Sequence, residues 1–115
     1  MTQHEITKAA PLLDASGNLT EPGWARSLLP VYCRSQIRAP KTRIKEWDYY
    51  CITDGHIGLA LTIADNGYMG LDSISFLNFD ERFEITKSPM RLFPMGKTHL
   101  PESSRLGASE IAASG

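Results

Sequence analysis

The sequence lacks an excess of charge of either sign and a long apolar segment. Its 115 residues include 12 basic and 13 acidic side chains, a formal net charge of −1. This balance provides no electrostatic footprint for nucleic acid or for an anionic membrane surface. No apolar run approaches the roughly 18 residues that a membrane-spanning helix needs. We therefore expect neither a nucleic-acid partner nor a membrane span.

Cysteine and histidine are also scarce, which argues against a disulfide scaffold and against zinc. Cys33 and Cys51 have no CxxC spacing, and we expect Cys51 to be a buried thiol because free cysteines are usually buried. The histidines, at positions 4, 56 and 99, show no ligand spacing. The N-terminus lacks the basic and apolar regions of an export signal. These observations predict a cytoplasmic protein without a metal or a cofactor.

Two Asx-Gly dipeptides predict an antiparallel meander. Asp54-Gly55 and Asn66-Gly67 are flanked by β-branched, aromatic and aliphatic residues, and such dipeptides are typical of two-residue type I′ hairpin turns. They predict three strands, at about 43–53, 56–65 and 68–79. A fourth apolar segment at 83–93 is interrupted by proline, which indicates an edge strand or a bulged strand. The fold class is therefore mainly β, with three to four antiparallel strands.

The rest of the chain reads as an irregular arm and a tail of small residues. Residues 1–41 are dense in turn-forming residues, and we expect one helical turn near 24–28. From position 105 onward the sequence has no aromatic residue and no alternation, which indicates a disordered or aberrant tail at 105–115. Residues 1–104 are interpreted as the N-terminal portion of one β-rich domain, with the arm at 1–41 and the sheet at 42–93.

Two-residue turns would fix which side chains share a face of the sheet. One buried face is expected to contain Leu59, Leu61, Ile63, Ile74 and Phe76. The opposite face is expected to carry Trp47, Tyr49 and Cys51 over small residues. Since neither face is cleanly polar, we expect both faces to be covered, in a sheet that is part of a larger β-barrel or sandwich.

Three carboxylates interrupt the aliphatic row and form the candidate site. In the predicted register Asp48 and Asp72 flank Leu61, roughly 10 Å apart, and Glu46 lies diagonally beside them. Carboxylates shielded in an apolar concavity can act as acids, bases or ligand anchors, so Glu46, Asp48 and Asp72 are the candidate catalytic side chains. The alternative is that they lie at the rim of the sheet, solvated or paired with Arg43, Lys45 or Arg91.

Several unusual sequence blocks resemble one protein family. They include Arg-Ile-Lys-Glu-Trp-Asp-Tyr-Tyr at 43–50, the segment 58–70, and Phe-Pro-Met-Gly-Lys at 93–97. They resemble the uncharacterised family numbered 2804 among the domains of unknown function, over about residues 3–104. The resemblance implies a mostly β protein with no established activity. Members of that family are much longer, so the resemblance also implies a truncated N-terminal fragment, and the family is similar to calycin-like β-barrels that handle lipids or isoprenoids.

Three functional hypotheses follow. Three or four strands cannot close a ligand-holding barrel, which typically has about eight strands. The first hypothesis is therefore one wall of a barrel that binds a small hydrophobic, lipid- or isoprenoid-like ligand. The second is a fragment of an acid–base enzyme, a hydratase or isomerase, that acts on an apolar substrate. The third is a truncated product without independent function. Whether the chain is an enzyme stays open, and self-association through an exposed sheet edge is a further expectation.

Overall fold

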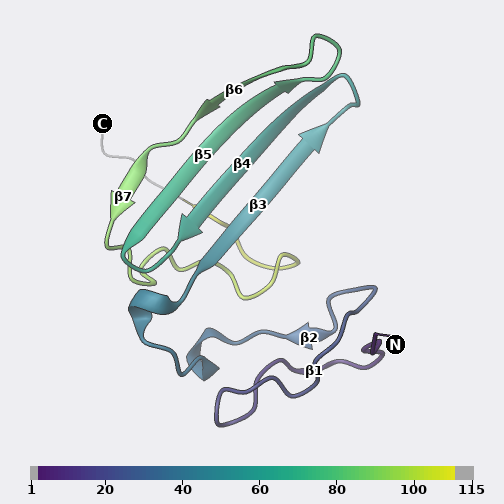
Figure 1. The fold of residues 1–115 in the computed structure, drawn as a ribbon, viewed down its shortest axis with the longest axis vertical. Coiled ribbons are helices and arrows are strands. Elements are labelled where there is room, and N and C mark those ends of the chain that lie inside the picture. Colours follow the sequence, from purple (N-terminus) through teal and green to yellow (C-terminus); the bar gives the residue numbers. More distant parts are fainter. Residues whose placement is uncertain (1–2, 111–115) are drawn as a thin grey trace. The chain divides into compact units, whose positions relative to one another are not determined.

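A computed structural model describes residues 3–110 of the chain. The chain divides into two compact units, Met1–Ala39 and Pro40–Gly115 (Figure 1).

The N-terminal unit is an irregular arm held by a few backbone bonds. Strands β1 (Ala10–Pro11) and β2 (Pro30–Val31) pair in parallel. Trp24 N donates to His4 O over 3.1 Å, and Ile6 N donates to Trp24 O over 2.8 Å. These bonds hold the backbone around Trp24 against a distant segment, which leaves it unavailable for a local helical turn.

The prediction of a helical turn near 24–28 is therefore wrong. In the described residues the helical turns are two short 3₁₀ segments, η1 (Arg34–Gln36) and η2 (Lys41–Arg43). The second of them belongs to the C-terminal unit and leads directly into the sheet.

The C-terminal unit is built on one antiparallel sheet. Its strands are β3 (Glu46–Thr53), β4 (Ile57–Asp65), β5 (Met69–Asn78), β6 (Phe83–Lys87) and β7 (Met90–Leu92). The order is β3-β4-β5-β6, and β7 also pairs with β5, beyond the end of β6 (Figure 1). The predicted meander and the interruption of its last strand at Pro89 are confirmed.

The turn between β3 and β4 is displaced by one residue from its predicted position. Asp54 N donates to Ile57 O over 3.3 Å, so the central pair is Gly55-His56 rather than Asp54-Gly55. Gly55 has a φ of +96°. A glycine with positive φ at the first central position is what a type II′ turn requires.

The turn between β4 and β5 is displaced in the same way. Asn66 N donates to Met69 O over 2.8 Å, which makes Gly67 and Tyr68 the central pair, and Gly67 has a φ of +79°. Sliding a turn by one residue changes every partner by two positions. Since side chains alternate with a period of two, the predicted faces survive while the predicted partners do not.

The register and this alternation define two faces of the sheet. The aliphatic face carries Tyr50, Ile52, Ile57, Leu59, Leu61, Ile63, Ile74, Phe76, Phe83 and Ile85, together with Glu46, Asp48, Asp65, Asp72, Lys87 and Arg91. The aromatic face carries Trp47, Tyr49, Cys51, Ala60, Thr62, Ala64, Leu71, Ser73, Ser75 and Leu77.

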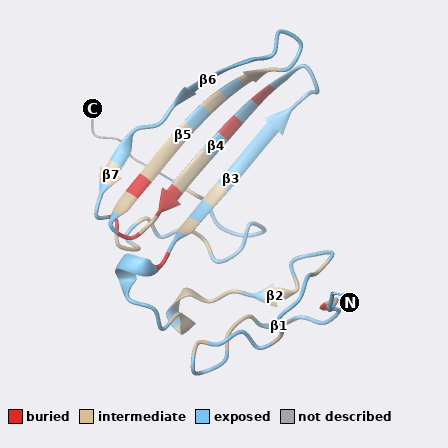
Figure 2. Ribbon diagram, viewed as in Figure 1, coloured by how far each residue is buried: buried red, intermediate tan, exposed pale blue. Residues whose placement is uncertain are grey.

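Burial differs from the prediction on both faces. Leu61 and Phe76 are each 37% exposed and Ile74 is 47% exposed, so the expected shared face exists but is not buried. Cys51 is an exposed free thiol on strand β3 rather than a buried one. Figure 2 shows that burial concentrates near one end of the sheet and along β4. Among the described residues of this unit, the buried apolar side chains include Ile44, Ala60 and Ala64.

Residues 93–110 return across the acidic end of the aliphatic face. Gly96 N and the Thr98 hydroxyl donate to Asp65, and the Ser109 hydroxyl donates to Asp48. In Figure 1 this yellow-green to yellow segment passes behind the sheet. The tail predicted at 105–115 lies partly outside the described residues, and the described part includes Ser109.

Candidate functional site

The candidate carboxylates lie on one face, in a row different from the predicted one. Asp48 and Asp72 both pair with Ile63, from β3 and β5 respectively, whereas the sequence placed Leu61 between them. Both turns are displaced by the same amount, so the two shifts preserve the alignment of Asp48 with Asp72. Glu46 lies in the neighbouring row and pairs with Asp65.

Asp72 on β5 is held by an arginine of the neighbouring strand, β7. Arg91 Nε donates to Asp72 Oδ2 over 2.6 Å, and an Arg91 terminal nitrogen donates to Asp72 Oδ1 over 2.8 Å. The Asp72 side chain is 14% exposed and that of Arg91 is 33% exposed. A bidentate pair of this kind is strong and favours both charged forms. Hydrogen bonding to Asp72, with added attraction from the charges of Asp72 and Asp65, raises the pKa of Arg91 above its usual range.

Asp65 is the most enclosed carboxylate of the described residues, with 2% of its surface exposed. Its Oδ1 accepts a hydrogen bond from Gly67 N at 2.9 Å. Its Oδ2 accepts bonds from Gly96 N at 2.7 Å and from the Thr98 hydroxyl at 3.1 Å. Three donors offset the cost of removing the carboxylate from water. Asp65 thereby ties the β4–β5 turn to the segment that follows β7.

Asp48 and Glu46 are both half-buried. The Asp48 carboxylate accepts a hydrogen bond from the Ser109 hydroxyl. The structure therefore brings the three predicted carboxylates onto one face with Asp65 and Arg91, and it provides most of them with donors from residues 91–109. The catalytic assignment of Glu46, Asp48 and Asp72 stays a prediction.

The segment that covers this cluster contains unusual backbone geometry. Phe93, Met95 and His99 have φ values of +53°, +52° and +53°. Non-glycine residues seldom adopt this region, and it persists where surrounding contacts determine the conformation. Here the contacts include Met95 N to Gly67 O at 3.0 Å. The segment after β7 therefore bonds both the buried carboxylate of Asp65 and the backbone of the β4–β5 turn.

Two open grooves lie along the aliphatic face beyond the acidic cluster. One, of about 300 Å³, is lined by Leu61, Ile63, Asp72, Ile74, Lys87 and Pro89 among others. The second, of about 230 Å³, is lined mainly by Ile52, Ile57, Leu59 and Phe76. Ligand-binding cavities typically measure about 300–1,000 Å³, so the first groove is at the lower limit of this range and the second is below it. Together they form an apolar track that has Asp72 and Lys87 in the lining of one groove and Asp54 in the lining of the other.

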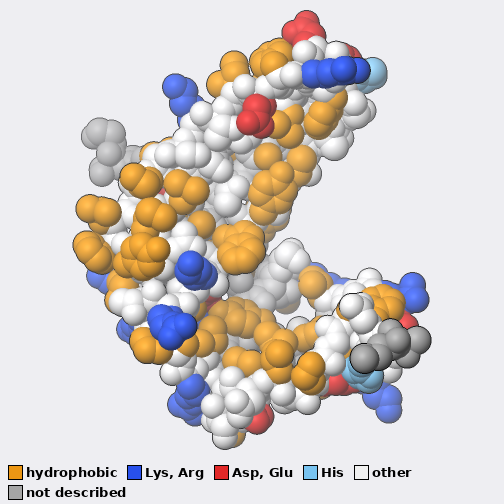
Figure 3. Space-filling model, in the orientation of Figure 1, with side chains coloured by type: hydrophobic (Ala, Val, Ile, Leu, Met, Phe, Trp, Pro, Cys, Tyr) orange, Lys and Arg blue, Asp and Glu red, His pale blue; other side chains and the backbone are white. Residues whose placement is uncertain are grey.

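The aromatic face differs in character. Trp47 and Tyr49 are 64% and 58% exposed, and they stand over small residues of β4. Figure 3 views the sheet from the side opposite to the returning segment and shows hydrophobic side chains scattered over it. None of the grooves described above opens on this face alone, so it offers a weaker candidate for ligand binding.

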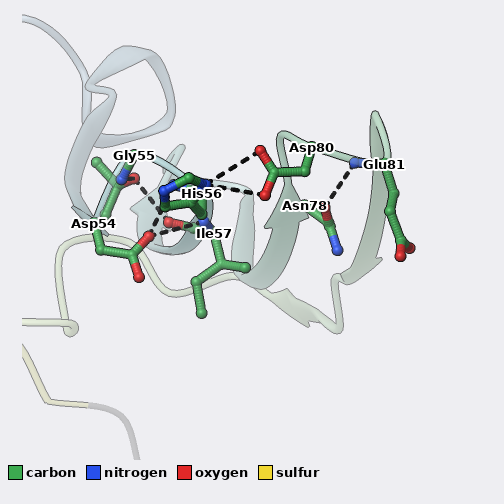
Figure 4. A network of polar contacts seen from close by, with 8 residues as sticks. Asp54, Gly55, His56, Ile57, Asn78, Asp80 and Glu81 are labelled. Carbon is green, nitrogen blue, oxygen red and sulfur yellow. Dashed lines mark hydrogen bonds and ion pairs between the residues drawn. The ribbon is translucent and has the colours of Figure 1, made fainter.

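A second polar network lies at the opposite end of the sheet. Asp54 Oδ1 accepts hydrogen bonds from the backbone nitrogens of His56 and Ile57, both at 2.9 Å, and these bonds lower the pKa of Asp54. His56 Nδ1 lies 3.0 Å from Asp80 Oδ2, across to the β5–β6 turn (Figure 4). The His56 side chain is 75% exposed. This network closes two turns, and its Asp54 also lines the second groove.

The described residues contain no group of three or more His, Cys, Asp or Glu side chains arranged to hold a metal ion. Across the same residues, no helix has the length and apolar character to cross a membrane.

Sequence reasoning missed Asp65. The signal was present: Asp65 continues the alternation of Ile57, Leu59, Leu61 and Ile63 onto the same face. It also lies two residues before a turn glycine, where an aspartate side chain commonly bonds the backbone ahead of it. The prediction ended the strand at Asp65 but did not include this residue in the face.

Comparison with known proteins identifies one family. The model of the family described as "Domain of unknown function (DUF2804)" matches residues 3–115. No curated protein and no solved structure matches the chain.

Proposed function

Because the chain belongs to this family of unknown function, we propose a function from the site itself: the aliphatic face binds a small hydrophobic ligand. The observation that carries the proposal is the apolar track formed by the two neighbouring grooves on this face. Exposed apolar surface of this extent commonly marks a binding site.

The side chains of the track are ordinary core residues left open to solvent. Leu59, Leu61 and Phe76 are each 37% exposed, although they lie on the central strands of the sheet. Removing apolar area from water yields roughly 25 cal/mol per Å². A ligand laid along the track would gain this free energy, and further β strands facing the track would complete the site as the opposite wall of a barrel.

The acidic cluster supports this proposal as an anchor. Asp65 bonds Gly96 and Thr98, and Asp72 is paired with Arg91. These bonds fix the segment after β7 over one end of the aliphatic face and so close one end of the track. A rigid end wall of this kind restricts a ligand to the open remainder of the face.

The test is binding of the neutral fluorophore Nile red to the full chain, with two matched variants. Leu61→Asn introduces an amide on the aliphatic face, and Tyr49→Asn introduces the same amide on the aromatic face. We expect saturable binding that Leu61→Asn weakens about fivefold, since it removes on the order of 1 kcal/mol of apolar contact. Tyr49→Asn should change the dissociation constant less than twofold.

Circular dichroism checks that both variants retain the sheet, and Ile74→Asn replaces Leu61→Asn if the latter unfolds. Equal weakening by the variants on the two faces, or binding that does not saturate, would overturn the proposal.

A further inference from the structure

We infer that the ligand of the aliphatic face carries an anionic head group, a carboxylate on an apolar chain, and that Lys87 binds this group. The inference rests on the proposed function and adds the chemical class of the ligand. It is carried by the position of Lys87 in the larger groove and by the charge balance around it.

Lys87 projects from the aliphatic face beside the apolar track. It is the last residue of β6 and pairs with Ile74 of β5, so its side chain shares a face with Ile74. It lines the groove of about 300 Å³ together with Leu61, Ile63 and Pro89. Its ammonium group therefore stands at the border between apolar lining and solvent, where a lysine extends its alkyl stem over apolar surface.

The ammonium of Lys87 is available for a ligand. Among the described residues, no hydrogen bond or ion pair of its side chain is found, and the residue is exposed. The neighbouring carboxylate in the groove, Asp72, is already bound through both oxygens by Arg91. Asp72 and Lys87 are the charged residues that line this groove, and because Asp72 is paired with Arg91, Lys87 is the lining charge without a partner among the described residues.

An unpaired cation in the lining of an apolar groove favours an amphiphile of opposite charge. A carboxylate at Lys87 would leave its chain free to follow Leu61, Leu59 and Phe76 toward the second groove. From the row of Ile74 to the row of Asn78 the strand advances four residues, roughly 13 Å. An unbranched chain of about ten carbons matches this distance. A neutral or cationic head group would gain nothing from Lys87.

The experiment measures displacement of Nile red by decanoate and by 1-decanol, both below the concentrations at which they aggregate. Lys87→Gln should raise the inhibition constant of decanoate about fivefold, the upper range for an exposed ion pair, and leave that of decanol unchanged. Lys45→Gln, an exposed lysine outside the groove, is the matched control and should alter neither. Lys87→Glu should weaken decanoate further and favour decyltrimethylammonium.

The outcomes separate the two proposals. Failure of Nile red to bind the aliphatic face of the unmodified chain would overturn the proposed function and this inference with it. Normal Nile red binding, with decanoate affected equally by Lys87→Gln and Lys45→Gln, would overturn only the assignment of the head group. An equal effect of Lys87→Gln on decanoate and decanol would do the same, because it would show that only the alkyl stem of Lys87 contributes.

Discussion

At the scale of single residues, the carboxylates of the aliphatic face differ in what holds them. Asp72 meets an arginine, whereas Asp65 meets two backbone nitrogens and a hydroxyl. The two arrangements have different consequences. Arg91 balances the charge of Asp72, whose side chain is still 14% exposed. The enclosed Asp65 instead supports the positions of two loops at once.

Replacement of Asp65 by Asn tests this difference. The variant keeps the shape but turns one acceptor oxygen into an amide donor facing the donors of the loops. We expect a loss of about 2–3 kcal/mol in the free energy of unfolding, the usual cost of unpaired buried groups. Urea denaturation of the full chain measures it.

The matched control is Asp80→Asn, which removes an exposed pair with His56 and should cost less than about 1 kcal/mol. Similar losses in both variants would show that Asp65 does not anchor the loops.

The residue scale also shows what could be predicted from the sequence. Alternation alone placed Asp48, Asp72 and Leu61 on one face, and it would have placed Asp65 there too. Their partners depend on contacts beyond the strands: two of the three donors of Asp65 come from residues 31 and 33 positions later. No local pattern announces such a distant bond, although Arg91 was among the partners that the sequence offered.

At the scale of elements, the two glycine turns set the register of the central strands. The dipeptides Asp54-Gly55 and Asn66-Gly67 identified the hairpins correctly, but they favoured a type I′ turn with glycine at the second central position. In the structure the aspartate and the asparagine close the turns instead. Asp54 can do so because its side chain accepts hydrogen bonds from the backbone nitrogens of His56 and Ile57. The dipeptide rule does not take such side-chain bonds into account.

The two turn glycines should respond differently to alanine. Both have positive φ, which costs a residue with a Cβ about 1–2 kcal/mol. A Cβ at Gly55 would meet nothing within 4 Å, whereas one at Gly67 would lie 2.6 Å from Lys41 O. We therefore expect Gly55→Ala to lower the free energy of unfolding by about 1 kcal/mol and Gly67→Ala by at least twice as much.

Thermal or urea unfolding of both variants measures the contrast. An equal loss would mean that the backbone around Lys41 does not pack against this turn.

The β3–β4 turn should also lose stability in acid. Backbone hydrogen bonds from Ile57 and His56 lower the pKa of Asp54 below its ordinary value of 3.8. A carboxylate whose pKa is lowered in the folded chain stabilises the folded state at higher pH. This contribution is lost as the pH falls from 3.8 through the pKa of the folded state. Carbon-detected NMR titration of the Asp54 carboxyl should give a midpoint below 3.8, with falling protection of the Ile57 amide over the same range.

A midpoint at or above 3.8 would contradict the role assigned to the two backbone bonds. The variant Asp54→Ala serves as the control, since its turn should show no change in protection over this range of pH.

At the scale of the whole molecule, the sheet presents more apolar surface than its own unit covers. Ile52, Ile57 and Ile74 remain 68%, 45% and 47% exposed, although alternation correctly assigned them to a common face. The sequence could indicate which side chains share a face, but not what covers it, because a cover is formed by separate segments or by a ligand. The proposed ligand would account for this surface.

The central claim is that the ligand lies on the aliphatic face, and intermolecular NOEs test it most directly. The full chain with labelled Leu and Ile methyl groups is titrated with unlabelled 1-decanol, and NOEs from the alkyl chain to the protein methyls are recorded. We predict NOEs to Leu59, Leu61 and Ile74 and none to Leu71 and Leu77 of the aromatic face. NOEs to Leu71 and Leu77 of equal strength, or to no methyl group of the aliphatic face, would contradict the account.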